Sequence, residues 1–272
     1  MTEEQVSKEV AAAVTRCMDG AMSIIAASKK KDSWAESVTS ILELAAAYAT
    51  TGNNELVARA VINRAIEYLV VEKDTIRMES CTMLGWCVGY LVESCKPAVS
   101  ILKKKGKHNN GGAANNTKRT NDATAGWKLE CLIDIGKALQ PRLTDKIAKV
   151  RNAAISACVP LFSSDGATKI VGTTTPTADS KNFEMMMNSI QNTLLWIMTN
   201  DSSAPNRALV AKQCCGRSVV SKETIPYVIE RVKDVDVKVR EAALDSLREN
   251  VNLDDLTEDQ RVEILRYGLT KR

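Results

Sequence analysis

The stretch DVDVKVREAALDSLREN, residues 234–250, decides the fold. Its apolar residues recur at the spacing of one helical face: Val239, Ala242, Ala243 and Leu247. The opposite face carries charged residues that water can solvate: Lys238, Glu241, Asp245 and Arg248. Asp236 stands just before the first helical residue, where its carboxylate can accept a free backbone N–H and cap the helix. We therefore expect an amphipathic helix that begins at about Asp236 and ends at about Asn250.

An aspartate six residues before an arginine recurs along the chain. Three copies share this spacing: Asp145 with Arg151, Asp201 with Arg207, and Asp234 with Arg240. A looser copy has Asp74 only three residues before Arg77. Recurrence of one helical unit about every 33–45 residues is typical of a solenoid. An aspartate in a turn followed by an arginine in the next helix resembles the HEAT-repeat pattern, so we expect an all-α HEAT-repeat solenoid of about five helix pairs.

We expect the six residues of the three regular copies to be structural. The stem of each arginine would pack between neighbouring helix pairs, and its guanidinium would bond the turn aspartate of its own or the next pair. The alternative is a charged ladder with a functional role of its own.

The composition fits a helical array. The chain is 44% hydrophobic but has only two Phe, five Tyr and four Trp, so Ala, Val, Leu and Ile must build the core. No run approaches the roughly 20 apolar residues that cross a bilayer. The N-terminal sequence MTEEQVSKEV is acidic and polar and shows no secretory signal. We expect an intracellular protein with no membrane partner.

Cysteine and histidine usage argues against a metal site. The eight Cys contain no CxxC pair, and most stand on expected apolar helix faces, where a free Cys behaves as a small hydrophobe. The single His, His108, stands in a polar stretch without co-ligands. GxSxG, P-loop, GxGxxG and His-Glu motifs are all absent from the sequence. We therefore expect no cofactor, no small-molecule substrate and no catalysis.

The chain divides into three parts. Residues 1–95 are expected to form helix pairs, with helices near 3–28, 34–50, 55–71 and 74–94. Residues 96–125 are poor in large apolar side chains and predict a disordered, basic loop. The sequence of residues 126–272 predicts further HEAT helices, interrupted by a second disordered loop at 163–182. Thr257 and Gln260 predict a capping box at the start of the last helix. No polar capping repeat follows that helix, so we expect a piece of a longer array.

The loop at 96–125 supplies most of the candidate DNA-binding residues. They are Lys103, Lys104, Lys105, Lys107, Lys118 and Arg119, with no acidic residue among them. Such side chains can follow phosphates without reading base sequence. Lys146 and Lys149 could extend this basic surface. The alternative is a solvated linker, and the net charge of only +4 keeps the electrostatic signal modest.

Two segments, 132–162 and 224–272, resemble successive repeats of the G-type HEAT subunit of condensin. The second carries the more specific pattern: Ile225, Pro226, Arg231, Lys233, Asp234, Val239, Arg240, Gln260, Arg261, Leu265, Gly268 and Leu269. The stretch EKDTIRMESCTMLGWCV, residues 72–88, resembles an earlier repeat of the same array.

The resemblance implies a non-catalytic regulatory subunit of the N-terminal portion of that family. Such a subunit would hold the kleisin chain and clamp double-stranded DNA without sequence specificity, beside the SMC subunits that drive mitotic chromosome condensation with ATP. The implied location is the nucleus and mitotic chromosomes, with a cytoplasmic pool. The alternatives are a HEAT scaffold or transport adaptor that binds only proteins and, less favoured, a HEAT-based enzyme.

Overall fold

The computed structural model describes residues 3–27, 54–94, 114–162, 178–213 and 224–268. Every regular element in these ranges is helical, so the expected all-α class is confirmed. Among the described helices, none combines the length and apolar character needed to cross a membrane. The described α-helices are α1 (Glu3–Ala27), α3 (Asn54–Tyr68), α4 (Asp74–Ser94), α5 (Ala114–Leu143), α6 (Ala148–Cys158), α8 (Ala178–Asn200), α9 (Ala204–Gln213), α10 (Ile225–Arg231), α11 (Val237–Asn250) and α12 (Glu258–Gly268). Two short 3₁₀ helices, Val159–Phe162 and Leu253–Asp255, follow α6 and α11.

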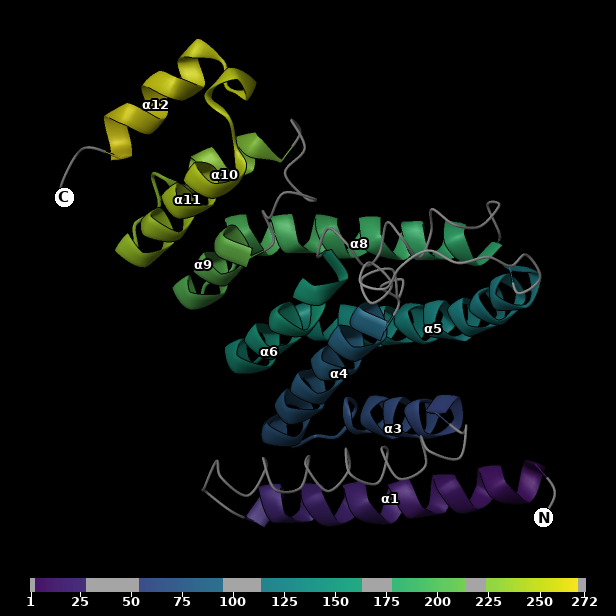
Figure 1. The fold of residues 1–272 in the computed structure, drawn as a ribbon. Helices are drawn as coiled ribbons and strands as arrows, with labels where there is room; N and C mark the ends of the chain where they lie inside the picture. The colour runs from purple at the N-terminus through teal and green to yellow at the C-terminus, as the bar shows by residue number, and fades with distance from the viewer. Residues whose placement is uncertain (1–2, 28–53, 95–113, 163–177, 214–223, 269–272) are drawn as a thin grey trace, which may run out of the picture.

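The helices stack from the N-terminus to the C-terminus in two layers (Figure 1). One layer contains α3, α5, α8 and α10, and the other contains α4, α6, α9 and α11. Each helix of the second layer packs on the helix that precedes it in the first, which makes four successive pairs. α1 packs on α3 at one end of the stack, and α12 packs on α10 and α11 at the other. This packing is consistent with a helical solenoid.

Aliphatic residues fill the space between the layers. In α5, Leu132, Ile135 and Leu139 recur at spacings of three and four and are fully buried. Glycines let neighbouring helices of the same layer approach closely. A Cβ on Gly85 of α4 would lie 2.9 Å from the Cα of Ala157 in α6, and one on Gly136 of α5 would overlap the sulfur of Met186 in α8.

Both helix caps expected from the sequence are confirmed. The carboxylate of Asp236 accepts a hydrogen bond of 2.8 Å from the backbone N–H of Lys238, at the start of α11. Before α12, the Thr257 N–H donates to the Gln260 side chain at 2.9 Å, and the Gln260 N–H donates back to the Thr257 hydroxyl at 3.3 Å. Local side-chain chemistry therefore sets these two helix starts.

The expectation of a loop over residues 96–125 is wrong for residues 114–125. α5 begins at Ala114, eleven residues before the expected end of the loop at Ala125, and it continues through Pro141 to Leu143. Extending a helix fixes one residue for each new hydrogen bond, so the strongly apolar second half of α5 can carry polar turns before it. A scarcity of apolar residues therefore does not by itself indicate a loop.

The second expected loop, residues 163–182, overlaps α8 in the same way, because α8 begins at Ala178. Asp179 in the first turn favours this earlier start through the helix dipole. The helix expected near 34–50 and the remaining parts of both expected loops lie outside the described residues.

Candidate functional site: a continuous aspartate–arginine ladder

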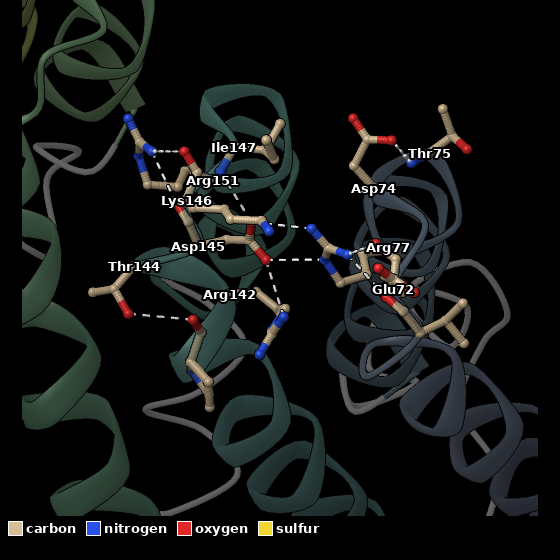
Figure 2. A network of polar contacts seen from close by, with 12 residues as sticks. Glu72, Asp74, Thr75, Arg77, Arg142, Thr144, Asp145, Lys146, Ile147 and Arg151 are labelled. Atoms are coloured by element: carbon tan, nitrogen blue, oxygen red, sulfur yellow. Dashed lines mark hydrogen bonds and ion pairs between the residues drawn. The ribbon is translucent and has the colours of Figure 1, made fainter.

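Asp145 forms the best-enclosed junction between two helix pairs (Figure 2). It lies in the turn between α5 and α6 and accepts two bonds from Arg77 of α4, at 3.0 Å from Nε and 3.3 Å from Nη2. The side chains of this pair are only 6% and 4% exposed. Arg142 donates to the same carboxylate at 2.9 Å, and the backbone N–H of Ile147 donates at 3.0 Å. The carboxylate therefore ties its own turn to the preceding helix pair.

Two further junctions repeat this geometry. Arg151 of α6 donates to Asp201 in the turn after α8, at 2.7 and 2.6 Å. Arg207 of α9 donates to Asp234 in the turn after α10, at 2.9 and 2.7 Å. Bidentate pairs of this kind fix orientation as well as distance. Arg77, Arg151 and Arg207 thus each pair with the aspartate in the turn of the next helix pair.

The spacing of six residues serves a different contact. The Nη1 atom of each arginine donates to the carbonyl oxygen six positions earlier, at 2.8 Å for Arg151, 2.7 Å for Arg207 and 2.9 Å for Arg240. Those carbonyls belong to the ladder aspartates Asp145, Asp201 and Asp234. Side chains and backbone together therefore form an unbroken ladder from Arg77 to Arg240.

The first rung corrects the looser copy expected at Asp74. Arg77 donates to the carbonyl of Val71 at 2.9 Å, so Val71 occupies the turn position that an aspartate holds in the later pairs. Asp74 instead accepts the N–H of Thr75 at 2.8 Å, at the start of α4. Asp74 is a helix-start residue and takes no part in the ladder (Figure 2).

The ladder keeps its carboxylates charged. Burial alone would raise the pKa of Asp201, but hydrogen bonds from Arg151, the Ser203 N–H and Asn206 outweigh it and lower the pKa below its ordinary value. The pKa values of Asp145 and Asp234 are lowered in the same way. Burial alone would raise them, but the arginines and a backbone N–H of the turn stabilise the anion. The three aspartates are therefore ionised at neutral pH.

Asn206 is a ladder residue that sequence reasoning missed. It is only 1% exposed, and its side-chain amide donates to the Ala148 carbonyl at 3.1 Å and to Asp201 at 3.2 Å. Its oxygen accepts from Asn152 at 3.0 Å. The available signal was its position directly before Arg207, where the other copies have Val150 and Val239. A buried amide there adds a polar tie between α6 and α9.

The candidate DNA-binding residues are only partly placed. Lys146 and Lys149 are both exposed, at the turn that leads into α6. Lys118 and Arg119 lie within α5, but the structure does not describe their side chains. Lys103, Lys104, Lys105 and Lys107 lie outside the described residues. The placed part of the candidate surface is therefore the Lys146–Lys149 turn, next to the Asp145 rung.

The residues that carry the condensin resemblance have packing roles in α10–α12. Arg231 donates to Asp234 at 3.3 Å. Lys233 pairs with Glu263 of α12, and its ammonium lies 5.4 Å from the centre of the Tyr267 ring. Lys233 and Asp234 therefore link α10 to the elements on either side of it. These three residues of the pattern therefore have structural contacts within the fold.

In the part of the chain that the structure describes, no three or more His, Cys, Asp or Glu side chains come together to form a possible metal site. The described cysteines are free thiols, and Cys81, Cys131 and Cys158 are buried. No family model matches the sequence, and no curated protein matches it.

Proposed function

We propose that the chain is a HEAT-repeat solenoid and acts as a non-catalytic regulatory subunit resembling the G-type subunit of condensin. It binds the kleisin chain and double-stranded DNA without base specificity, in a complex with SMC subunits. The observation that carries the proposal is the ladder from Arg77 to Arg240, because it links four successive helix pairs in the way expected for a HEAT array.

The ladder supports a scaffold role on physical grounds. Breaking a buried ion pair by removing one partner costs several kcal/mol, so the ladder resists changes in the spacing of adjacent helix pairs. A stack with fixed spacing offers a long continuous surface, which suits an extended peptide such as kleisin or a stretch of duplex. No step of bond making or breaking is required of this chain.

The exposed Lys146 and Lys149 support the DNA part of the proposal. Lys146 lies in the turn before α6 and Lys149 lies in the first turn of α6, so both belong to the same short segment. Both are solvated, so they can neutralise phosphates and release counterions without rearrangement of the fold. The basic residues at 103–107 would add to the same sequence-independent attraction.

A fluorescent duplex of about 30 base pairs, titrated across a salt series, tests this proposal. The double variant Lys146→Glu and Lys149→Glu should lose affinity and flatten the salt dependence. A matched double variant, Lys137→Glu and Lys181→Glu, makes the same charge change at exposed positions of α5 and α8 and should retain more of the affinity. Equal losses in both variants would exclude a specific contact at the Lys146–Lys149 turn.

A second variant tests the basic residues at 103–107 separately from the Lys146–Lys149 turn. Lys103, Lys104, Lys105 and Lys107 are changed together to Gln, which leaves α5 intact because α5 begins at Ala114. A flatter salt dependence in this variant would assign phosphate contacts to these four lysines. Absence of duplex binding at low salt, together with retained co-purification with a kleisin chain, would favour a scaffold that binds only protein partners.

A further inference from the structure

Two aromatic side chains of α4 are about half exposed. Trp86 is 49% exposed and Tyr90 is 57% exposed. They stand four positions apart, so one turn of helix brings the two side chains next to each other. Together they leave about 200 Å² of surface to solvent, half of the area that two aromatic side chains can bury. α4 therefore presents a small apolar patch.

Gly89 makes a recess beside the two aromatic residues. It lies three positions after Trp86 and directly before Tyr90, so it borders both on the helix surface. A Cβ on Gly85 would lie 2.9 Å from the Cα of Ala157 in α6, whereas a Cβ on Gly89, one turn later, would meet nothing within 4 Å. The helix backbone at Gly89 is therefore the floor of an open slot, and Trp86 and Tyr90 are its walls.

The size of this slot limits what can occupy it. A stable contact between two folded proteins buries about 800 Å² on each partner, roughly four times the area that the two aromatic residues leave exposed. A docked amphipathic helix needs anchor positions on several turns. Trp86 and Tyr90 are the large apolar residues that are exposed among the described side chains of α4, and they occupy a single turn. The slot therefore fits a short, extended segment.

The chemistry of the slot favours proline. Among the described side chains of α4 within one turn of the two aromatic residues, none is charged, so a neutral ring matches the slot better than a charged side chain. Extended proline-rich segments dock on aromatic side chains because their rings are rigid and their conformation exists before binding. A proline brings no backbone N–H that must be satisfied, and the Tyr90 hydroxyl can donate to a carbonyl of the segment.

We propose that Trp86, Gly89 and Tyr90 form a docking slot for a short proline-rich segment of a partner protein. A proline ring lies on Gly89 between the two aromatic side chains, and the segment crosses α4 in the polyproline II conformation. This contact goes beyond the proposed duplex binding and does not depend on it, because the slot uses none of the candidate DNA-binding residues.

A fluorescent peptide of about ten prolines is the probe, and a glycine–serine peptide of the same length is its control. Fluorescence anisotropy with the full chain should show saturable binding of the proline peptide, with a dissociation constant below about 1 mM, and weaker binding of the control. Trp86→Ala and Tyr90→Ala should each weaken binding about tenfold. Trp196→Ala changes a tryptophan of α8 that is 55% exposed, and it should leave binding unchanged.

Gly89→Gln separates binding from folding. Glutamine favours a helix over glycine, and the open space around Gly89 accepts a side chain, so the melting temperature should stay the same or rise. The glutamine side chain fills the slot, so binding of the proline peptide should fall about tenfold. If this turn of α4 served the fold alone, Gly89→Gln would leave the binding unchanged.

Three results would overturn the proposal: no binding of the proline peptide at about 1 mM, equal binding of the glycine–serine peptide, or an equal loss in Trp196→Ala and Trp86→Ala. Exposed aromatic rings can also stack on bases. Binding of a single-stranded dT oligonucleotide through Trp86, without binding of the proline peptide, would assign the slot to nucleic acid instead. Duplex affinity should be equal in Trp86→Ala and the unchanged protein, so this proposal and the proposed duplex binding are tested separately.

Discussion

Arg151 of α6 and Asp201 after α8 are 50 residues apart in the sequence, yet they form a bidentate pair with bonds of 2.7 and 2.6 Å. The carboxylate of Asp201 is fully enclosed, with its side chain 0% exposed. The carbonyl of the same residue accepts a bond of 2.7 Å from Arg207. Asp201 therefore completes one rung with its side chain and begins the next with its backbone.

Asp201→Asn should destabilise the fold by about 3 kcal/mol, because it leaves the largely buried Arg151 guanidinium without a counter-charge. The substitution keeps the shape of the side chain, so the loss reports the charge and the altered hydrogen bonds. Urea denaturation followed by circular dichroism measures the change in the free energy of unfolding.

Arg248→Ala is the matched control for this experiment. Arg248 also pairs with a carboxylate, that of Asp245 at 3.0 Å, but its side chain is 72% exposed. Exposed pairs of this kind contribute at most about 1 kcal/mol. Similar losses in Asp201→Asn and Arg248→Ala would contradict a special role for the buried ladder.

Acid should weaken the ladder. The folded-state pKa values of Asp145, Asp201 and Asp234 lie below the ordinary 3.8, so the unfolded chain takes up protons first as the pH falls. The stability that the ladder contributes is complete well above pH 3.8 and is lost as the pH falls through this value to the folded pKa values. Melting temperatures measured from about pH 7 to pH 2 should fall most steeply at the acid end.

A ladder variant provides the comparison for the acid profile. Asp145→Asn removes one titrating group, so its melting temperature should start lower at neutral pH and depend less on acid than that of the unchanged protein. Arg248→Ala should keep the full acid dependence. Parallel profiles for Asp145→Asn and the unchanged protein would show that Asp145 does not contribute to the pH dependence.

The sequence predicts the ladder because its spacing has a local cause. An arginine in the second turn of a helix reaches the carbonyl six residues earlier, so the aspartate and arginine recur at that distance. Whether the arginine binds the aspartate of its own helix pair or that of the next depends on how the helix pairs stack. The local spacing in the sequence does not encode this stacking. The first rung shows this limit, since Val71 keeps the carbonyl contact without any carboxylate.

Other features depend on long-range contacts in the same way. Composition predicts a loop before Trp127, but α5 continues backward to Ala114. Asn206 is an ordinary polar residue in the sequence and becomes a buried tie only because α6 lies beside α9. Only some of the candidate DNA-binding residues can be placed in the structure. Lys146 and Lys149 belong to a described segment, whereas residues 103–107 lie outside the described residues.

Thiol reactivity should follow burial. Burial raises the pKa of Cys81 to about 12, and it raises the pKa of Cys158 as well. Because the thiolate is the reactive form, both should resist iodoacetamide at about pH 8 in the folded protein. Cys17 is exposed on α1 and should be labelled before Cys81 and Cys158. Mass spectrometry of peptides from protein labelled with and without denaturant measures the extent of labelling at each cysteine. Labelling of Cys158 as fast as Cys17 in the folded state would contradict the packing of α4 on α6.

Two glycines of α4, four residues apart, test that packing most directly. A Cβ on Gly85 would lie 2.9 Å from the Cα of Ala157, a backbone atom that cannot move without shifting α6, whereas a Cβ on Gly89 meets nothing within 4 Å. Alanine favours a helix over glycine by about 1 kcal/mol, so Gly89→Ala should stabilise the protein by up to that amount. Gly85→Ala gains the same helix preference but forces α4 and α6 apart, at a cost of about 1–3 kcal/mol, so its net effect should be destabilising. Thermal melts of the two variants should therefore move in opposite directions, and a rise in melting temperature for Gly85→Ala would mean that α4 and α6 do not approach as closely as this structure requires.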